Sequence, residues 1–168
     1  MRQDVLNFNQ FDEEFKEELL LFVGRNADIY EKRWTKMGQR RNKMVSWHWP
    51  AFFVSPFWSG YRQYWPGVWI YLGLYIVDGL LDVWLPVKFA YYDQTMFVVS
   101  VIYGLFSNYN YLNFAVQHIE TMRQVEPDRE KRKFELTEQG GPSVPKFWLA
   151  FAMMTVVGIA MMNLGRLF

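Results

Sequence analysis

The chain has 168 residues, of which 51% are hydrophobic and 20% aromatic, and its formal net charge is +1. So small a charge excludes a strongly basic nucleic-acid-binding protein, because no surplus of Lys and Arg is available to neutralise phosphates. The lack of cysteine excludes a disulfide framework, a thiolate nucleophile and a cysteine-based metal site. Charges gather in residues 1–46 and 117–146, whereas residues 47–116 and 147–168 are mostly apolar and aromatic, which favours a membrane protein over a soluble domain.

Residues 1–45 predict a cytoplasmic region of two amphipathic helices. The first twenty residues lack the basic start and apolar run of a secretory signal, so membrane insertion must come from internal segments. Gly24 is the expected stop signal of the first helix, and Asn26 is the expected N-cap of the second. The apolar residues at helical spacing are Phe11, Phe15, Leu19 and Phe22 in the first helix, and Tyr30, Trp34 and Met37 in the second.

The second helix carries a basic flank, formed by Lys32, Arg33, Lys36 and Arg40. This flank suits anionic lipid headgroups. A solvated basic face on a small helical hairpin explains it equally well.

The segment 46–65, "SWHWPAFFVSPFWSGYRQYW", holds nine aromatic rings, two prolines and a single permanent charge. It is short for a full crossing and is interrupted by Pro50 and Pro56, so it predicts an interfacial or shallow re-entrant helical segment. Aromatic rings sit at headgroup level, and an Arg side chain can reach the lipid phosphates. The residues expected to contact lipid or a partner are Trp47, Trp49, Phe53, Trp58, Tyr61, Arg62 and Trp65.

Three apolar segments follow, at residues 66–86, 95–116 and 147–168. As a helix the first would extend roughly 31 Å, which matches a hydrocarbon core of about 30 Å. The far end of the second contains Asn108, Asn110 and Asn113, which either hydrogen-bond to other helices or mark the cytoplasmic end of the span. We favour the latter, with Tyr109 and Tyr111 as interface anchors. Ser143 and Pro145 are expected to start the third span.

The charged residues 117–146 predict a solvent-exposed cytoplasmic helix and turn, with Asp128 and Arg132 spaced for a surface ion pair. Cations are abundant before the first span and between the second and third. The short loop between the first two spans has only Lys88, and the C-terminus has only Arg166. By the positive-inside rule the N-terminus is cytoplasmic and the C-terminus lies outside.

Two carboxylates, Asp78 and Asp82, lie four residues apart inside the first apolar segment. An ionisable group within a membrane helix usually faces a cavity or a partner, which suggests an ion or proton path. Both residues lie within two turns of Pro86, so they could equally reach the outer headgroups or pair with Lys88.

Several stretches of this sequence carry a specific pattern: "FVGRNADIYEKRWTKM", then "VSWHWPAFFVSPFWSGYRQYW", and later "YGLFSNYNYLNFAVQHI". Between about residues 22 and 122 this pattern resembles the bacterial membrane proteins grouped as domain of unknown function 2628. The last apolar segment resembles the family as well. His48, Pro50 and Ser55 depart from the family's usual Asn, Ala and Gly. The resemblance implies a multi-pass protein of the bacterial inner membrane and no particular activity.

The sequence thus predicts an all-α membrane protein with about three transmembrane helices, an interfacial aromatic segment and cytoplasmic N-terminal helices. We expect no catalytic residue, no cofactor and no metal site. The leading hypothesis is a non-enzymatic accessory or scaffold protein that binds membrane lipids and a membrane-protein partner or a second copy of itself. A small oligomeric ion-linked transporter using Asp78 and Asp82 is the alternative, and an enzyme acting on a lipid is a third.

Overall fold

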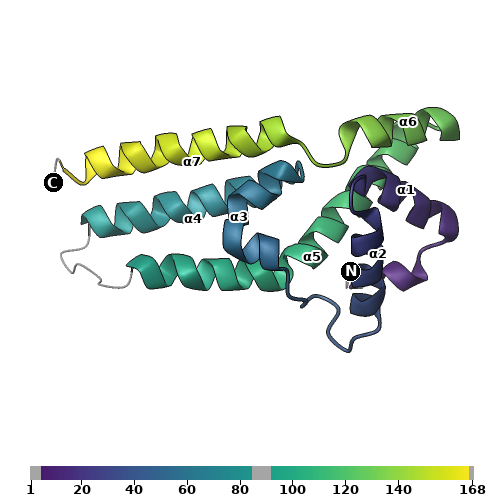
Figure 1. The fold of residues 1–168 in the computed structure, drawn as a ribbon, viewed down its shortest axis with the longest axis horizontal. Coiled ribbons are helices and arrows are strands. Elements are labelled where there is room, and N and C mark those ends of the chain that lie inside the picture. The colour runs from purple at the N-terminus through teal and green to yellow at the C-terminus, as the bar shows by residue number, and fades with distance from the viewer. Residues whose placement is uncertain (1–4, 85–91, 167–168) are drawn as a thin grey trace. The chain divides into compact units, whose positions relative to one another are not determined.

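The computed structural model describes residues 5–84 and 92–166, which form helices and contain no strand (Figure 1). The predicted all-helical fold class is confirmed for these residues. The chain divides into two compact units. Unit 1 consists of Met1–His48 and Leu105–Pro142, and unit 2 consists of Trp49–Gly104 and Ser143–Phe168. The predicted short loop with Lys88 lies outside the described residues.

Unit 1 contains the 3-10 helix η1 (Phe8–Gln10), α1 (Glu13–Val23), α2 (Ala27–Gly38), the second part of α5 and α6 (Arg129–Gln139). Helix α1 begins where the Asp12 carboxylate accepts the Phe15 N–H at 2.7 Å, and it ends at Gly24, where φ is 63°. The predicted stop is confirmed. Asn26 is the N-cap of α2, as predicted, although its side chain makes no capping hydrogen bond.

The core of unit 1 lies where α1, α2, α5 and α6 turn their apolar faces inward. Helix α2 presents Trp34, which is wholly buried and donates its Nε1–H to the Asn108 carbonyl at 3.1 Å. Burying a large apolar side chain stabilises a fold by about 1.5–3 kcal/mol. Other side chains at or near complete burial are Leu19, Phe22, Met37, Tyr111, Leu112, Ile119 and Leu136.

A buried carboxylate links three helices of unit 1. Glu18 on α1 is 0% exposed, and its two oxygens accept the Nε–H groups of Arg123 and Arg132, each at 2.7 Å. Arg132 also donates to the carbonyl oxygens of Glu126 and Pro127, at 3.0 and 3.2 Å. These bonds compensate the cost of removing the charges from water.

The predicted surface pair between Asp128 and Arg132 is wrong. Asp128 is the N-cap of α6, where its carboxylate accepts the backbone N–H groups of Glu130 and Lys131, each at 3.0 Å. The hydrogen bond from Lys131 lowers the pKa of Asp128 most, because it favours the charged carboxylate. Arg132 points instead into unit 1, since α6 packs on the acidic helix α1.

Helix α5 (Tyr92–Val125) is a single helix of 34 residues, about 51 Å long at about 1.5 Å per residue. It therefore runs beyond residue 116, where the sequence predicted the second span to end. From Leu105 onward it belongs to unit 1, where Tyr111 is wholly buried. Asn108 Nδ2 donates to Ser46 Oγ at 2.7 Å. Tyr111 is thus not an interface anchor. Asn108 hydrogen-bonds to another part of the chain, which is the hypothesis that the sequence analysis did not favour.

Unit 2 contains α3 (Trp49–Tyr61), α4 (Trp65–Trp84), the start of α5 and α7 (Val144–Leu164). Helices α4 and α7 run side by side in the same direction, α5 starts in the opposite direction, and α3 packs on α4 and α7 (Figure 1). Helix α3 is broken at Val54 and Ser55, just before Pro56, whose ring removes a backbone donor.

A close contact joins α3 to the beginning of α7. A Cβ atom on Gly60 would lie 2.7 Å from the Ala150 Cβ and 2.8 Å from the Lys146 carbonyl oxygen, so only glycine allows this approach. The Ser143 N–H donates to the Tyr61 carbonyl at 2.7 Å. The Ser143 hydroxyl accepts the Lys146 N–H at 3.4 Å, which confirms the predicted start signal of this helix.

Candidate membrane interface

The broken helix α3 presents aromatic rings toward two neighbouring helices of unit 2. On one side, Trp49 stacks on Phe53 with ring centroids 5.7 Å apart, and Phe52 meets Phe97 of α5 edge to face at 6.0 Å. We call these four residues the α3–α5 aromatic cluster. Trp49, Phe53 and Phe97 are 58%, 71% and 59% exposed. Rings left this open in a soluble protein would be costly, whereas an interface of lipid and water accommodates them.

On its other side, α3 shares a second group of rings with α7. Phe57 lies 5.9 Å from Phe147 and 5.5 Å from Phe151, and Trp148 packs edge to face on Phe147. We call these four residues the α3–α7 aromatic cluster. Phe147 and Phe151 are one helical turn apart, a spacing visible in the sequence. Phe97 gave no such signal, because its contact with Phe52 joins residues from separate helices.

The structure separates the predicted lipid-contact residues by exposure. Trp49 and Phe53 face outward, and Trp47, Tyr61 and Trp65 are half-buried. Trp58 and Arg62 are buried, at 5% and 4% exposed, so their predicted contact with lipid headgroups does not fit their positions. The Arg62 guanidinium lies 5.9 Å from the Tyr61 ring centroid. Helix geometry explains the division, because α3 turns one face toward α4 and α7.

The outer faces of α4 and α7 are apolar along their length. Helix α7 is long and apolar enough to cross a membrane, and only 6% of its apolar window is buried. Residues Trp65–Leu81 of α4 form a shorter apolar helix. The exposed large apolar side chains are Trp69, Ile70, Leu74, Val77, Leu80 and Leu81 on α4, and Val144, Trp148, Leu149, Phe151, Val156, Ile159 and Met162 on α7. So many exposed apolar side chains on two neighbouring helices are typical of a surface that meets lipid or another apolar partner.

Two pairs of hydroxyl groups lie between α3 and α5 in unit 2. The hydroxyls of Ser59 and Tyr103 form a hydrogen bond, which joins α3 to α5. Ser55 Oγ, at the break in α3, lies 3.5 Å from Ser100 Oγ of α5. A hydroxyl in apolar surroundings needs a partner, because water is not available to replace it. These pairs therefore fix how the broken helix meets α5.

Of the two carboxylates predicted to form an ion path, the structure describes the side chain of Asp78 only. Asp78 is half-buried on α4, and its Oδ2 is inaccessible to solvent. The Asp82 side chain lies outside the described part of the chain. Among the described residues, no three of His, Cys, Asp and Glu gather so as to hold a metal ion. The geometry thus offers apolar and aromatic surface for binding, and one half-buried carboxylate.

The two histidines lie in unit 1 with separate partners. His48 is buried, with its Nε2 3.5 Å from the Tyr30 hydroxyl, although the sequence placed it in the interfacial segment. His118 Nε2 lies 3.1 Å from Gln139 Oε1. Burial lowers the pKa of His118, and the hydrogen bond with Gln139 opposes that shift.

Comparison with known proteins identifies one family. The family described as "Protein of unknown function (DUF2628)" matches residues 12–117, from the N-cap of α1 into α5. No curated protein matches the chain, and no solved structure does. The matched region contains the whole aromatic segment and α4, and it covers more than half of the sequence. The chain therefore belongs to the DUF2628 family.

Proposed function

We propose that this chain is a multi-pass protein of the bacterial inner membrane, with unit 2 in the bilayer and the charged surface of unit 1 in the cytoplasm. The observation that carries the proposal is the outward apolar surface of unit 2, where Phe53 is 71%, Ile70 57% and Val156 66% exposed. Helices satisfy their own backbone hydrogen bonds and can therefore present such side chains to hydrocarbon. Unit 1 instead surrounds its core with ion pairs.

The orientation follows the distribution of cations. The N-terminal region and the segment after α5 are rich in Lys and Arg, so both belong on the cytoplasmic side. Helices α4 and α7 run in the same direction within unit 2, which suits two outward crossings (Figure 1). The start of α5 returns toward the cytoplasm. The C-terminus then lies outside.

Single cysteines test this topology cleanly, because the natural chain has none. Val156→Cys, Glu130→Cys and Arg166→Cys probe α7, unit 1 and the C-terminal end. In intact cells a membrane-impermeant maleimide should label only Arg166→Cys, and opening the membrane should expose Glu130→Cys as well. Val156→Cys should stay unlabelled until detergent is added. Equal labelling of Val156→Cys and Glu130→Cys in membranes would exclude a bilayer position for α7.

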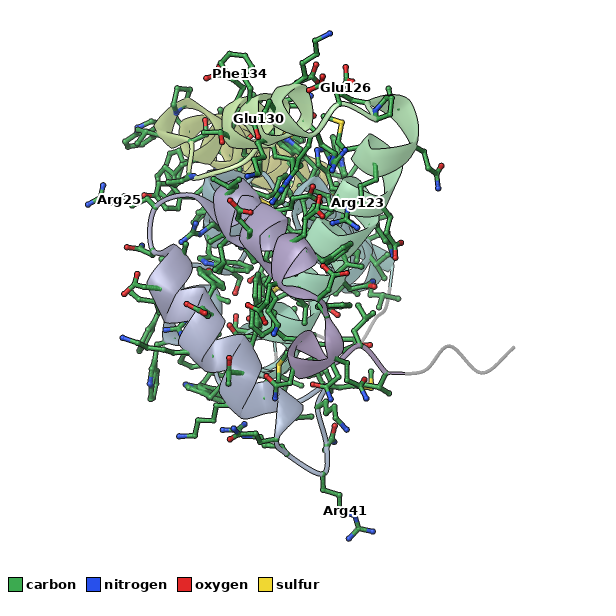
Figure 2. The ribbon with its side chains drawn as sticks, turned by 90° about the vertical axis from the view of Figure 1, so that its right-hand side faces the viewer. Arg25, Arg41, Arg123, Glu126, Glu130 and Phe134 are labelled. Carbon is green, nitrogen blue, oxygen red and sulfur yellow. The ribbon has the colours of Figure 1, made fainter. Side chains whose placement is uncertain are left out.

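Within that membrane position, the function that we propose is that of a non-enzymatic accessory or scaffold protein that binds a membrane partner. Unit 1 supports this with two large apolar side chains open to water, Val125 at 73% and Phe134 at 68% exposed. Figure 2 shows Phe134 extending outward, and Glu130 precedes it by one helical turn on α6. An apolar side chain rimmed by charge is typical of a binding surface.

Purification in nanodiscs followed by mass spectrometry tests the scaffold function. A membrane protein retained by the wild-type chain should be lost from Phe134→Ser. Ile29→Ser, which removes a 41% exposed apolar side chain from α2, is the matched control and should retain the partner. Retention of the same protein by Phe134→Ser would remove this surface from the proposal.

The alternative function, a small oligomeric ion-linked transporter, has one supporting observation. Asp78 is a half-buried carboxylate in an otherwise apolar helix, a placement that ion and proton paths use. Ion flux through liposomes containing the chain separates it from the scaffold function.

A further inference from the structure

Unit 1 carries a basic surface on the outer side of α2 and the segment after it. We define the basic surface as Lys32, Arg33, Lys36, Arg40, Arg41 and Lys43. Between Arg25 and His48 the sequence has seven cations and two acids. On α2, Lys32 and Lys36 are exposed and lie away from the buried face, which holds Tyr30, Trp34 and Met37, whereas Arg33 is half-buried beside Tyr30. The surface is therefore both strongly positive and turned away from the core.

Two of these cations contact uncharged groups within unit 1: Arg40 donates to the Val45 carbonyl oxygen at 3.1 Å, and Arg33 lies 5.8 Å from the Tyr30 ring centroid. Among the described residues, none of the six forms an ion pair with a carboxylate. The cations of α6 differ, since Lys133 pairs with Glu17 at 2.8 Å and Arg129 with Glu17 at 3.1 Å. The hydrogen bond from Lys133 lowers the pKa of Glu17. The acidic helix α1 thus compensates α6 and leaves the basic surface for an external anion.

The shape of the basic surface suits a phosphate-bearing headgroup. A hollow of about 340 Å³ is lined by Val5, Arg41, Asn42, Lys43 and Met44. Figure 2 shows Arg41 extending away from the ribbon beyond the end of α2. Val5 and Met44 are 44% and 39% exposed, so apolar groups lie beside the cations. That mixture matches the boundary between headgroups and acyl chains.

Chain length keeps the basic surface close to the aromatic segment. Lys43 precedes Trp49 by six residues, which span at most about 21 Å when fully extended. Trp49 belongs to the α3–α5 aromatic cluster, which the proposed function assigns to the interface. A tether of this length allows the cations to come within about 8 Å of the membrane, the Debye length over which its negative surface potential acts.

We propose that the basic surface binds the anionic headgroups of membrane lipids and so holds α2 against the cytoplasmic leaflet. This inference rests on the proposed function, because it requires unit 2 to lie in the bilayer. Electrostatic attraction and the short tether act together: the tether supplies a high local concentration of headgroups, and the charge selects anionic ones.

The test uses the full chain in nanodiscs of phosphatidylcholine, with or without phosphatidylglycerol. A fluorophore sensitive to its surroundings is attached to Gln39→Cys, and a quencher is carried on a minor fraction of lipid headgroups. We expect strong quenching with phosphatidylglycerol, weak quenching without it, and reversal by high salt. Equal quenching in both lipids overturns the inference. Glycerol phosphate added to phosphatidylcholine discs should leave the fluorescence at Gln39→Cys unchanged. A fluorescence change as large as that caused by phosphatidylglycerol would mean that the surface binds a soluble anion, and it would overturn the proposal of a lipid ligand.

Matched variants locate the effect. Arg41→Gln with Lys43→Gln removes two cations that make no ion pair, so the fold should persist, and the contact equilibrium should fall about 30-fold. Lys131→Gln with Arg166→Gln removes the same charge elsewhere and should leave quenching unchanged. An equal loss in both pairs would overturn the basic surface as the site.

A second readout separates this inference from the proposed function. The native tryptophans of unit 2 should be quenched by lipids brominated on the acyl chain in every variant. If that quenching persists while the Gln39→Cys signal ignores lipid charge, only the inference fails. If the tryptophans are not quenched, the proposed function fails, and the inference fails with it.

Discussion

Arg132 Nε donates to Glu18 Oε1 at 2.7 Å, and the two side chains are only 8% and 0% exposed. The second oxygen of Glu18 accepts Arg123 Nε at the same distance. One carboxylate on α1 therefore joins α5 and α6. Without this carboxylate Arg123 would lose the ion pair that it forms, and Arg132 would keep only its longer ion pair with Glu14, at 3.3 Å.

Glu18→Gln should destabilise unit 1 by roughly 3–5 kcal/mol, because breaking a buried ion pair strands the remaining charge. Glu13→Gln is the control. It removes a carboxylate that is 91% exposed and pairs with Lys16, so it should cost at most about 1 kcal/mol. Urea unfolding of the full chain, followed by circular dichroism, measures both. A similar loss in the two variants would mean that the buried pair contributes no more than a surface pair.

Gly60→Ala should destabilise the packing of α3 on α7 by about 1–3 kcal/mol, because the new Cβ would lie 2.8 Å from the Lys146 carbonyl oxygen. Gly73→Ala serves as the matched control, since no atom lies within 4 Å of its added Cβ. That control should be neutral or stabilising by up to about 1 kcal/mol, because alanine favours a helix. Thermal melting in detergent compares the two. Equal melting temperatures for Gly60→Ala and Gly73→Ala would show that α3 and α7 can move apart to accept the added Cβ without loss of stability.

Local signals in the sequence predicted where helices begin and end, but they did not predict which residues of different helices make contact. The stop at Gly24 and the start at Ser143 depend on neighbouring residues, and both were predicted correctly. Glu18 looked like any acid on the polar face of α1, because its partner Arg132 lies 114 residues away. The spacing of residues along α1 does not show which of its acidic residues will be buried by the basic helix α6.

The aromatic segment illustrates the same limit within the candidate site. Its composition predicted an interface, and the exposure of Trp49 and Phe53 fits that expectation. The burial of Trp58 and Arg62 was missed, because composition does not tell which side chains of the segment will be covered when α3 packs on α4 and α7.

Asp78→Asn distinguishes the scaffold from the transporter. If the chain is a scaffold, liposomes containing wild-type protein or Asp78→Asn should show the proton flux of empty liposomes. Asp28→Asn, an exposed carboxylate of unit 1, controls for the loss of charge. A flux in the wild-type chain that Asp78→Asn abolishes and Asp28→Asn preserves would favour the transporter, since a half-buried carboxylate in an apolar helix would then be on the ion path.

His118 should make unit 1 less stable as the solution becomes mildly acidic. Burial lowers its pKa in the folded chain below the ordinary value of 6.5, so the unfolded chain binds the proton more readily. The stability of the folded chain is then complete above that ordinary value and falls as the pH drops through the lowered one.

His118→Gln keeps a polar side chain beside Gln139 but cannot titrate in this range. The melting temperature of the wild-type chain should therefore fall more steeply than that of the variant between about pH 7 and about pH 5. The carboxylates of unit 1 add the same slope to both proteins, so the difference between the two curves isolates the imidazole. Parallel curves would mean that His118 takes up its proton in the folded chain as easily as in the unfolded one, which its half-buried position between Phe22 and Phe114 argues against.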